Sequence, residues 1–167
     1  MPQAGEEGGA NNLMDRFSKT LLAAAAESGL ATITLSRHMP SLRRSISNDD
    51  EVVVLAHCVR PDGQVSGDHL MLLTRNRLVV SKQSKVLNRV RVEIEAAMTE
   101  LEDVRWAADP QLPGVELAFN AGGDRHRFWI DAAHGKHMWR LDALLAKQFR
   151  RPSAAAASLA SHARGFA

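Results

Sequence analysis

The chain has very few of the residues that build disulfide frameworks or nucleic-acid stacking surfaces. Only one of its 167 residues is cysteine, Cys58, which excludes an internal disulfide and any zinc or iron–sulfur site made from several cysteines. Tyrosine is absent, and five phenylalanines and three tryptophans leave few rings to stack on bases. The sequence has no apolar run of about 18 residues, the length that a membrane-spanning helix needs. The remaining composition, 45% hydrophobic and 24% charged, is typical of a folded domain.

The two ends of the chain have no apolar pattern. Residues 1–11 are acidic and rich in glycine, without the basic segment and apolar stretch that a signal peptide needs. Residues 151–167 are rich in alanine and serine and are expected to be a flexible tail, as are residues 1–11. We expect a cytoplasmic protein, with peripheral association with a membrane left open.

Residues 12–50 are predicted to form a helical extension. Apolar residues recur there at intervals of three or four, the period of a helix with one buried face: Met14, Phe17, Leu21 and Ala25. Gly29 stands at the expected C-terminal end of this helix. A second, short helix is predicted over 41–46, with Pro40 at its start.

From residue 51 the pattern changes to short alternating runs between turn residues, which is typical of antiparallel strands. Seven strands are predicted, over 52–58, 69–74, 77–82, 89–95, 103–108, 115–119 and 125–131. A helical turn is expected at 97–101. The last predicted element is a helix over 132–150, whose apolar stripe is formed by Met138, Leu141, Leu145 and Phe149 and broadened by Trp139 and Leu144.

The faces of the predicted strands differ. In 89–95 the alternation places Val90, Val92 and Ile94 on one face. The runs 52–55 and 70–73 are apolar on both faces, so both faces must be covered. The helix that carries Phe17 and Leu21 is one candidate for this cover, and a partner protein is the other. Trp129 points away from its apolar neighbours Phe128 and Ile130.

Seven antiparallel strands followed by one closing helix resemble the pleckstrin-homology superfold. Two local sequences are similar to the bacterial pleckstrin-homology-like domains: LLTRNRLVV at 72–80 and RVEI at 91–94. The resemblance covers residues 51–150 and implies an α+β fold, a seven-stranded antiparallel barrel capped by a C-terminal helix. The helices predicted within 12–50 lie outside the family pattern.

One stretch of the chain is strongly basic. No acidic residue occurs between Asp68 and Glu93, and six cations do: Arg75, Arg77, Lys82, Lys85, Arg89 and Arg91. A hairpin of this composition can hold the phosphate oxygens of lipid headgroups or nucleic acid, or it can be a solvated strand edge that resists aggregation. Eukaryotic pleckstrin-homology domains bind inositol phosphates mostly through their first hairpin loop, which is a poor match at 60–67. A net charge of +2 and few aromatic residues argue against nucleic acid as a partner.

No residue pattern indicates a reaction centre. His134 and His137 have a spacing that can bind a metal, but no third ligand stands at a fixed distance from them. Cys58 lies within a predicted strand and is interpreted as a small buried hydrophobic residue. No glycine-rich phosphate loop, nucleophile elbow or carboxylate pair occurs. We therefore predict that the chain is not an enzyme and carries no metal or cofactor.

The sequence predicts a non-catalytic protein-binding module, an adaptor or accessory subunit that docks on another protein or a multisubunit complex. Surplus apolar side chains are its expected contacts: Phe17, Leu21, Met71 and Trp129. The alternative is a peripheral membrane protein that binds anionic lipid through the basic hairpin, while the helix over 12–28 inserts its Phe17 and Leu21 face.

Overall fold

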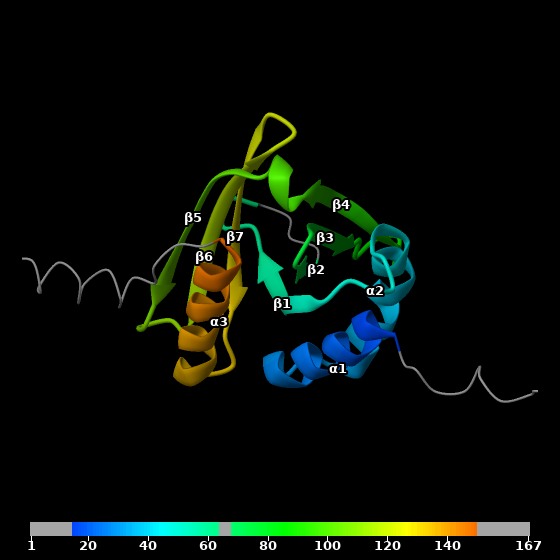
Figure 1. Cartoon of the computed structure of the whole chain (residues 1–167), viewed down its shortest axis with the longest axis horizontal. Coiled ribbons are helices and arrows are strands. Elements are labelled where there is room, and N and C mark those ends of the chain that lie inside the picture. Colours follow the sequence, from blue (N-terminus) through cyan, green and yellow to red (C-terminus); the bar gives the residue numbers. More distant parts are fainter. Residues whose placement is uncertain (1–14, 64–67, 150–167) are drawn as a thin grey trace, which may run out of the picture.

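The computed structural model describes residues 15–63 and 68–149 (Figure 1). The flexible tails predicted at 1–11 and 151–167 lie outside these residues. Two helices come first, α1 (Arg16–Ser28) and α2 (Thr32–Ser45). Seven strands follow: β1 (Val52–Val59), β2 (Asp68–Thr74), β3 (Arg77–Gln83), β4 (Val90–Ala97), β5 (Glu102–Asp109), β6 (Gly114–Ala121) and β7 (Asp124–Asp131). A short 3-10 helix, η1 (Met98–Glu100), joins β4 to β5, and α3 (Gly135–Gln148) ends the described chain.

The strands form one antiparallel sheet in the order β4-β3-β2-β1-β7-β6-β5. The sheet curves round on itself, with β4 and β5 as its two edges, and α3 packs against β5, β6 and β1 (Figure 1). The indole nitrogen of Trp106 in β5 donates to Asp142 in α3 at 3.0 Å, which fixes the helix on that strand. The predicted fold class, α+β with seven antiparallel strands in one curved sheet capped by a C-terminal helix, is confirmed.

The inner core fills the curve of the sheet. Alternate residues of the strands point inward and meet the apolar face of α3; among the largest are Met71, Leu117, Phe119, Phe128, Met138 and Leu141. Each of these side chains is at most 2% exposed. This burial explains the alternation in the strands and the three- and four-residue spacing in the last helix.

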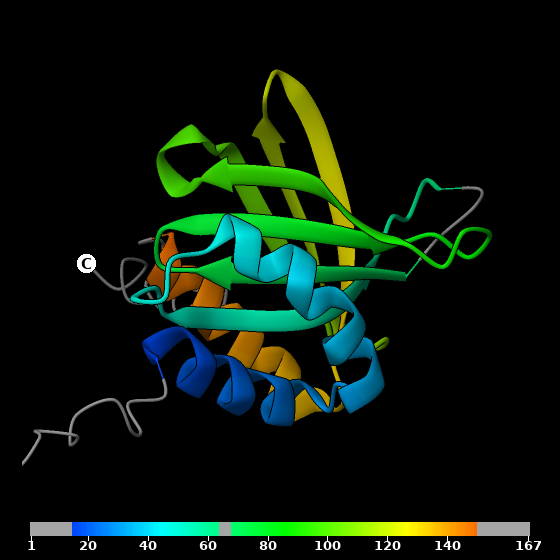
Figure 2. The ribbon, with the colours of Figure 1, turned by 90° about the vertical axis from the view of Figure 1, so that its right-hand side faces the viewer.

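A second core lies on the outer face of the sheet. Helix α1 lies alongside β1 there, and α2 crosses over β3 and β4, as Figure 2 shows. Their buried residues meet the outward side chains of the strands: Phe17, Leu21 and Leu42 against Leu55, Leu70, Leu72 and Val79. The strands with two apolar faces are thus covered on both sides within the chain. The sequence left open whether a helix of this chain or a partner protein covers these strands, and in the structure the helices do so.

Local signals hold α1 in place. The side chain of Asp15 accepts a hydrogen bond from the backbone N–H of Ser18 at 2.6 Å and caps the first turn. Gly29 ends the helix with a left-handed φ of 64°, which glycine adopts without steric cost. The hydroxyl oxygen of Thr20 accepts from the N–H of Val52 at 2.9 Å and so ties α1 to the start of β1.

The second predicted helix is present and covers most of 41–46, but its predicted start at Pro40 was wrong. Helix α2 begins at Thr32, nine residues before the expected start at 41, and Pro40 lies inside it. Its buried stripe is Leu35, His38 and Leu42, at the helical spacing of three and four. A histidine in the middle of that stripe, followed by a proline, conceals the apolar period in the sequence.

The prediction that Val90, Val92 and Ile94 share one face was also wrong. The pairing of β3 with β4 runs from Val80↔Ile94 directly to Ser81↔Val92, so Glu93 is an extra residue in a bulge. Because the bulge shifts the register by one residue, Val92 packs against the outer core while Ile94 belongs to the inner one.

Candidate functional site

The apolar residues predicted to contact a partner lie mostly inside the chain. Phe17, Leu21 and Met71 are 1%, 2% and 1% exposed. The first two belong to the outer core and Met71 to the inner core. Their side chains stabilise the fold and are absent from its surface, so a docking surface has to be sought elsewhere.

Trp129, the fourth predicted contact residue, is half-buried on the outer face of β7. Its ring lies over Gly114 of β6: a Cβ atom placed at that glycine would lie 2.3 Å from Cζ2 of the indole. The indole nitrogen donates to the carboxylate of Asp131 at 3.0 Å. Gly114 therefore provides the room that the ring occupies on the sheet.

The six predicted cations do not form one patch. Arg75 and Arg77 lie at the β2–β3 turn. The other four cations lie near the opposite end of β3, which is about 20 Å away along this seven-residue strand: Lys82, Lys85, Arg89 and Arg91. Arg75 is ion-paired with Glu51 at 3.1 Å and Arg77 with Glu95 at 2.7 Å. These two arginines are neutralised within the chain.

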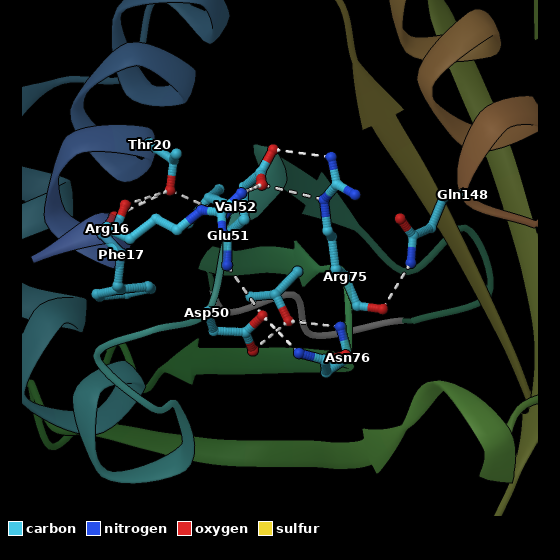
Figure 3. Close-up of polar contacts among 10 residues, drawn as sticks. Arg16, Phe17, Thr20, Asp50, Glu51, Val52, Arg75, Asn76 and Gln148 are labelled. Atoms are coloured by element: carbon cyan, nitrogen blue, oxygen red, sulfur yellow. Dashed lines mark hydrogen bonds and ion pairs between the residues drawn. The ribbon is translucent and has the colours of Figure 1, made fainter.

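The β2–β3 turn is a structural joint (Figure 3). The buried carboxylate of Asp50 accepts from the Thr74 hydroxyl at 2.7 Å and from the Asn76 amide at 3.1 Å. The backbone carbonyl of Arg75 accepts from the side chain of Gln148 in α3 at 3.0 Å. These bonds link the start of β1, the turn and the last helix, which gives this end of the sheet a role in stability.

The other end of β3 carries the hairpin tip, which we define as residues 84–89. The N–H of Ser84 donates to the carbonyl of Arg89 at 2.9 Å and closes the loop. Inside it, the N–H of Leu87 donates to the Ser84 hydroxyl at 3.3 Å. Asn88 has a left-handed φ of 46°, and its side chain accepts from the amide of Gln83 at 2.8 Å. Side-chain and backbone hydrogen bonds therefore set the shape of the tip.

The hairpin tip presents two apolar side chains to solvent, Val86 at 92% and Leu87 at 69% exposure. It projects beyond the body of the sheet at the right of Figure 2. The basic cluster surrounds it: Lys85 and Arg89 within the loop, and Lys82 and Arg91 as directly paired residues of β3 and β4. In the described part of the chain, none of these four cations has an ion-pair partner.

The sequence interpretation found the four cations but missed Val86 and Leu87. Two adjacent apolar residues between Ser84 and Asn88, both turn-forming residues, are the signal that they lie in a loop and not in a strand. Such a pair cannot be buried by the local sheet, and its exposure has a cost in water.

Glu93 is the acidic residue nearest the basic cluster along β4. The bulge directs it to Nε2 of His69, at 3.0 Å, and to the guanidinium of Arg60, at 3.3 Å. Burial alone would raise the pKa of Glu93, but Arg60, His69 and Lys82 outweigh burial and hold that pKa below its ordinary value. The Arg60 guanidinium also stacks 4.6 Å from the ring centroid of Phe128. Glu93 is thus paired with Arg60 and His69; it also interacts electrostatically with Lys82, but in the described residues it makes no ion pair with the basic cluster.

Cys58, His134 and His137, which the sequence analysis considered for catalysis or metal binding, have roles in the folded structure. Cys58 is fully buried in the inner core, and this burial raises the pKa of its thiol. His134 and His137 cap the start of α3: the first accepts from the N–H of His137 at 3.2 Å, and the second accepts from the N–H of Ala133 at 3.0 Å. Within residues 15–63 and 68–149, no three histidine, cysteine, aspartate or glutamate side chains are grouped for a metal ion.

No helix in the described ranges is both long and apolar enough to cross a bilayer. No family model and no curated protein match the chain. Among solved structures, the DH/PH domains of p115-RhoGEF align with a TM-score of 0.47 and 11% identity over 80% of this chain and 42% of that one. The linker-DH/PH domains of the same protein align with a TM-score of 0.44 and 14% identity over 80% and 40%. This chain spans about two fifths of their length, and its fold class rests on strand order and the capping helix.

Proposed function

We propose that this chain is a non-catalytic binding module that docks on an anionic membrane surface through the hairpin tip and the basic cluster. The observation that carries the proposal is the exposure of Val86 and Leu87 in a hydrogen-bonded loop ringed by four unpaired cations. An apolar tip favours the interior of a bilayer, and lysine and arginine favour the anionic headgroups beside it.

The magnitudes suit weak, reversible docking. Burying an aliphatic side chain of this size stabilises by about 1.5–3 kcal/mol. Each lysine or arginine held near an anionic leaflet contributes about 1 kcal/mol. Two apolar residues and four cations together offset the cost of immobilising the protein at the surface, which is of similar size. Neither contribution suffices alone.

The mode of insertion differs from the one expected from sequence. Phe17 and Leu21 are buried against the sheet, so α1 cannot insert this face without leaving the outer core. The hairpin tip needs no such rearrangement because Val86 is already exposed. We place the contact there and leave α1 in its structural role.

Co-sedimentation with vesicles tests the proposal. The protein is mixed with vesicles of phosphatidylcholine containing phosphatidylserine, and with vesicles of phosphatidylcholine alone. We expect binding to the first, loss of binding in Val86→Ser/Leu87→Ser and in Lys85→Gln/Arg89→Gln, and weakening by salt because ions screen the exposed cations.

Matched variants separate the tip from general effects. Leu22→Ser/Ile33→Ser removes two apolar side chains of 53% and 60% exposure from the helices, and Arg37→Gln/Arg44→Gln removes two exposed cations from α2. Both should bind vesicles as the wild type does. Equal binding by the tip variants, or equal binding to neutral vesicles, would refute the proposal.

Docking on a larger protein assembly, as an adaptor in the cytoplasm, is the second candidate function. A different surface favours it, the unpaired edge of β4, described below. The similarity of residues 72–80 and 91–94 to bacterial pleckstrin-homology-like domains supports either kind of binding module, and we propose membership of that family on this basis.

A further inference from the structure

The sheet has an open edge beside a cleft. Strand β4 pairs with β3 alone, and it is the last strand on its side of the sheet. A cleft of about 510 Å³ runs along it, walled on the far side by the β6–β7 turn. Figures 1 and 2 show β4 and this hairpin at the same open corner of the barrel.

The cleft follows the strand. Four consecutive residues of β4, from Glu93 to Ala96, line it, a length of about 10 Å. An edge strand offers backbone N–H and C=O groups to any extended chain that lies beside it. The opposite wall, formed by Ala121, Gly122 and Asp124, confines such a chain to the edge.

The charged side chains that line the cleft are acidic: Glu93, Glu95, Glu100 and Asp124. Arg60 and Arg77 neutralise the first two. In the described part of the chain, the carboxylates of Glu100 and Asp124 have no ion-pair partner. Of these two carboxylates, that of Glu100 accepts a hydrogen bond from the N–H of Ala97 at 2.7 Å. Their charge repels a second copy of this edge and attracts a basic chain.

We propose that the β4 edge and its cleft bind an extended basic segment of a partner protein by adding it as a strand. Backbone hydrogen bonds to β4 supply the pairing, and lysine or arginine side chains at alternate positions meet Glu100 and Asp124. This surface faces a corner of the barrel apart from the hairpin tip, so it does not depend on membrane docking.

A labelled peptide of alternating lysine and valine provides the probe, and fluorescence anisotropy at low ionic strength measures its binding. Glu100→Gln/Asp124→Asn should weaken the binding about five- to tenfold, because two exposed ion pairs are lost. Asp49→Asn/Asp62→Asn, with the same change in net charge elsewhere on the surface, should change it less than about twofold.

Two further peptides test the mode of binding. A peptide with glutamate in place of lysine should not bind, and a peptide N-methylated along one edge should bind at least about tenfold more weakly because it cannot pair with a strand. The Val86→Ser/Leu87→Ser protein should bind the parent peptide as the wild type does, which separates this result from the vesicle experiment. Absent binding of the parent peptide, indifference to N-methylation, or an equal effect of both double variants of the protein would overturn the proposal.

Discussion

The Nδ1 atom of His38 lies 2.6 Å from the hydroxyl oxygen of Ser81, and neither residue is exposed to solvent. The Ser81 hydroxyl also lies 3.5 Å from the carbonyl oxygen of Leu70, and the tautomer of the imidazole decides which partner donates in the bond to His38. Nε2 of His38 has no hydrogen-bond partner among the described residues. This contact joins α2 to β3 in the outer core, where burial disfavours the charged form of the imidazole.

The stability of the protein should therefore depend on pH. Burial lowers the pKa of His38 below the ordinary histidine value of about 6.5, and His57 and His69 act in the same direction, while Asp68 opposes them. Between the lowered pKa and 6.5 the unfolded chain binds more protons than the folded chain. The free energy of unfolding should fall as pH falls through this window. Urea denaturation between about pH 7 and about pH 5 measures it.

Replacing the histidine should flatten that dependence. His38→Gln cannot take up a proton and should cost about 1 kcal/mol near neutral pH through the weakened bond to Ser81. Its stability should fall less with acid than that of the wild type. His126→Gln, at a half-buried imidazole outside the outer core, should keep the wild-type slope. Equal slopes for wild type and His38→Gln would show that His38 is not the group responsible.

Gly114 is predicted to be intolerant of a side chain. A Cβ atom there would lie 2.3 Å from the Trp129 ring and 2.9 Å from the carbonyl oxygen of Ile130. Gly114→Ala should destabilise the protein by about 1–3 kcal/mol, measured by thermal or urea unfolding. Gly135→Ala meets no atom within 4 Å, and at the start of α3 it should be neutral or stabilising by up to about 1 kcal/mol. Similar effects of the two substitutions would contradict the packing of Trp129 on Gly114.

Phe17 tests whether α1 is part of the folded core. Its ring is 1% exposed, and Phe17→Ala should cost about 3–5 kcal/mol in the free energy of unfolding. Leu22→Ala, on the same helix but 53% exposed, should cost at most about 0.5 kcal/mol. If Phe17→Ala were as mild as Leu22→Ala, α1 would be detached from the sheet in solution and free to bind a partner.

The sequence predicts the strands and the last helix because their burial has a simple period. The inner core takes every second residue of each strand, and α3 contributes residues three and four apart. The start of α2 and the β4 bulge escape this reasoning. Each depends on a contact distant in sequence: His38 is buried by Ser81, and Glu93 is turned aside by His69 and Arg60.

The candidate site was only partly predictable for the same reason. Composition reveals six cations between residues 68 and 93, but the fold separates Arg75 and Arg77 from the other four and pairs them with Glu51 and Glu95. From sequence alone, a surplus apolar residue such as Phe17 can be assigned to a partner-binding surface. The structure shows instead that its helix covers the sheet and buries it. The exposed pair Val86 and Leu87 became significant only once the hairpin tip was placed.

A probe attached at the hairpin tip tests the central claim most directly. Because Cys58 is buried and its thiol pKa is raised, a cysteine introduced by Val86→Cys can be labelled selectively with a nitroxide. In vesicles containing phosphatidylserine, we predict that this label gains access to oxygen and loses access to a water-soluble nickel complex. A label at Leu112→Cys, another exposed loop position at 68%, should stay in water. A Val86→Cys label that remains as accessible to nickel as the one at 112 would contradict membrane docking through this hairpin.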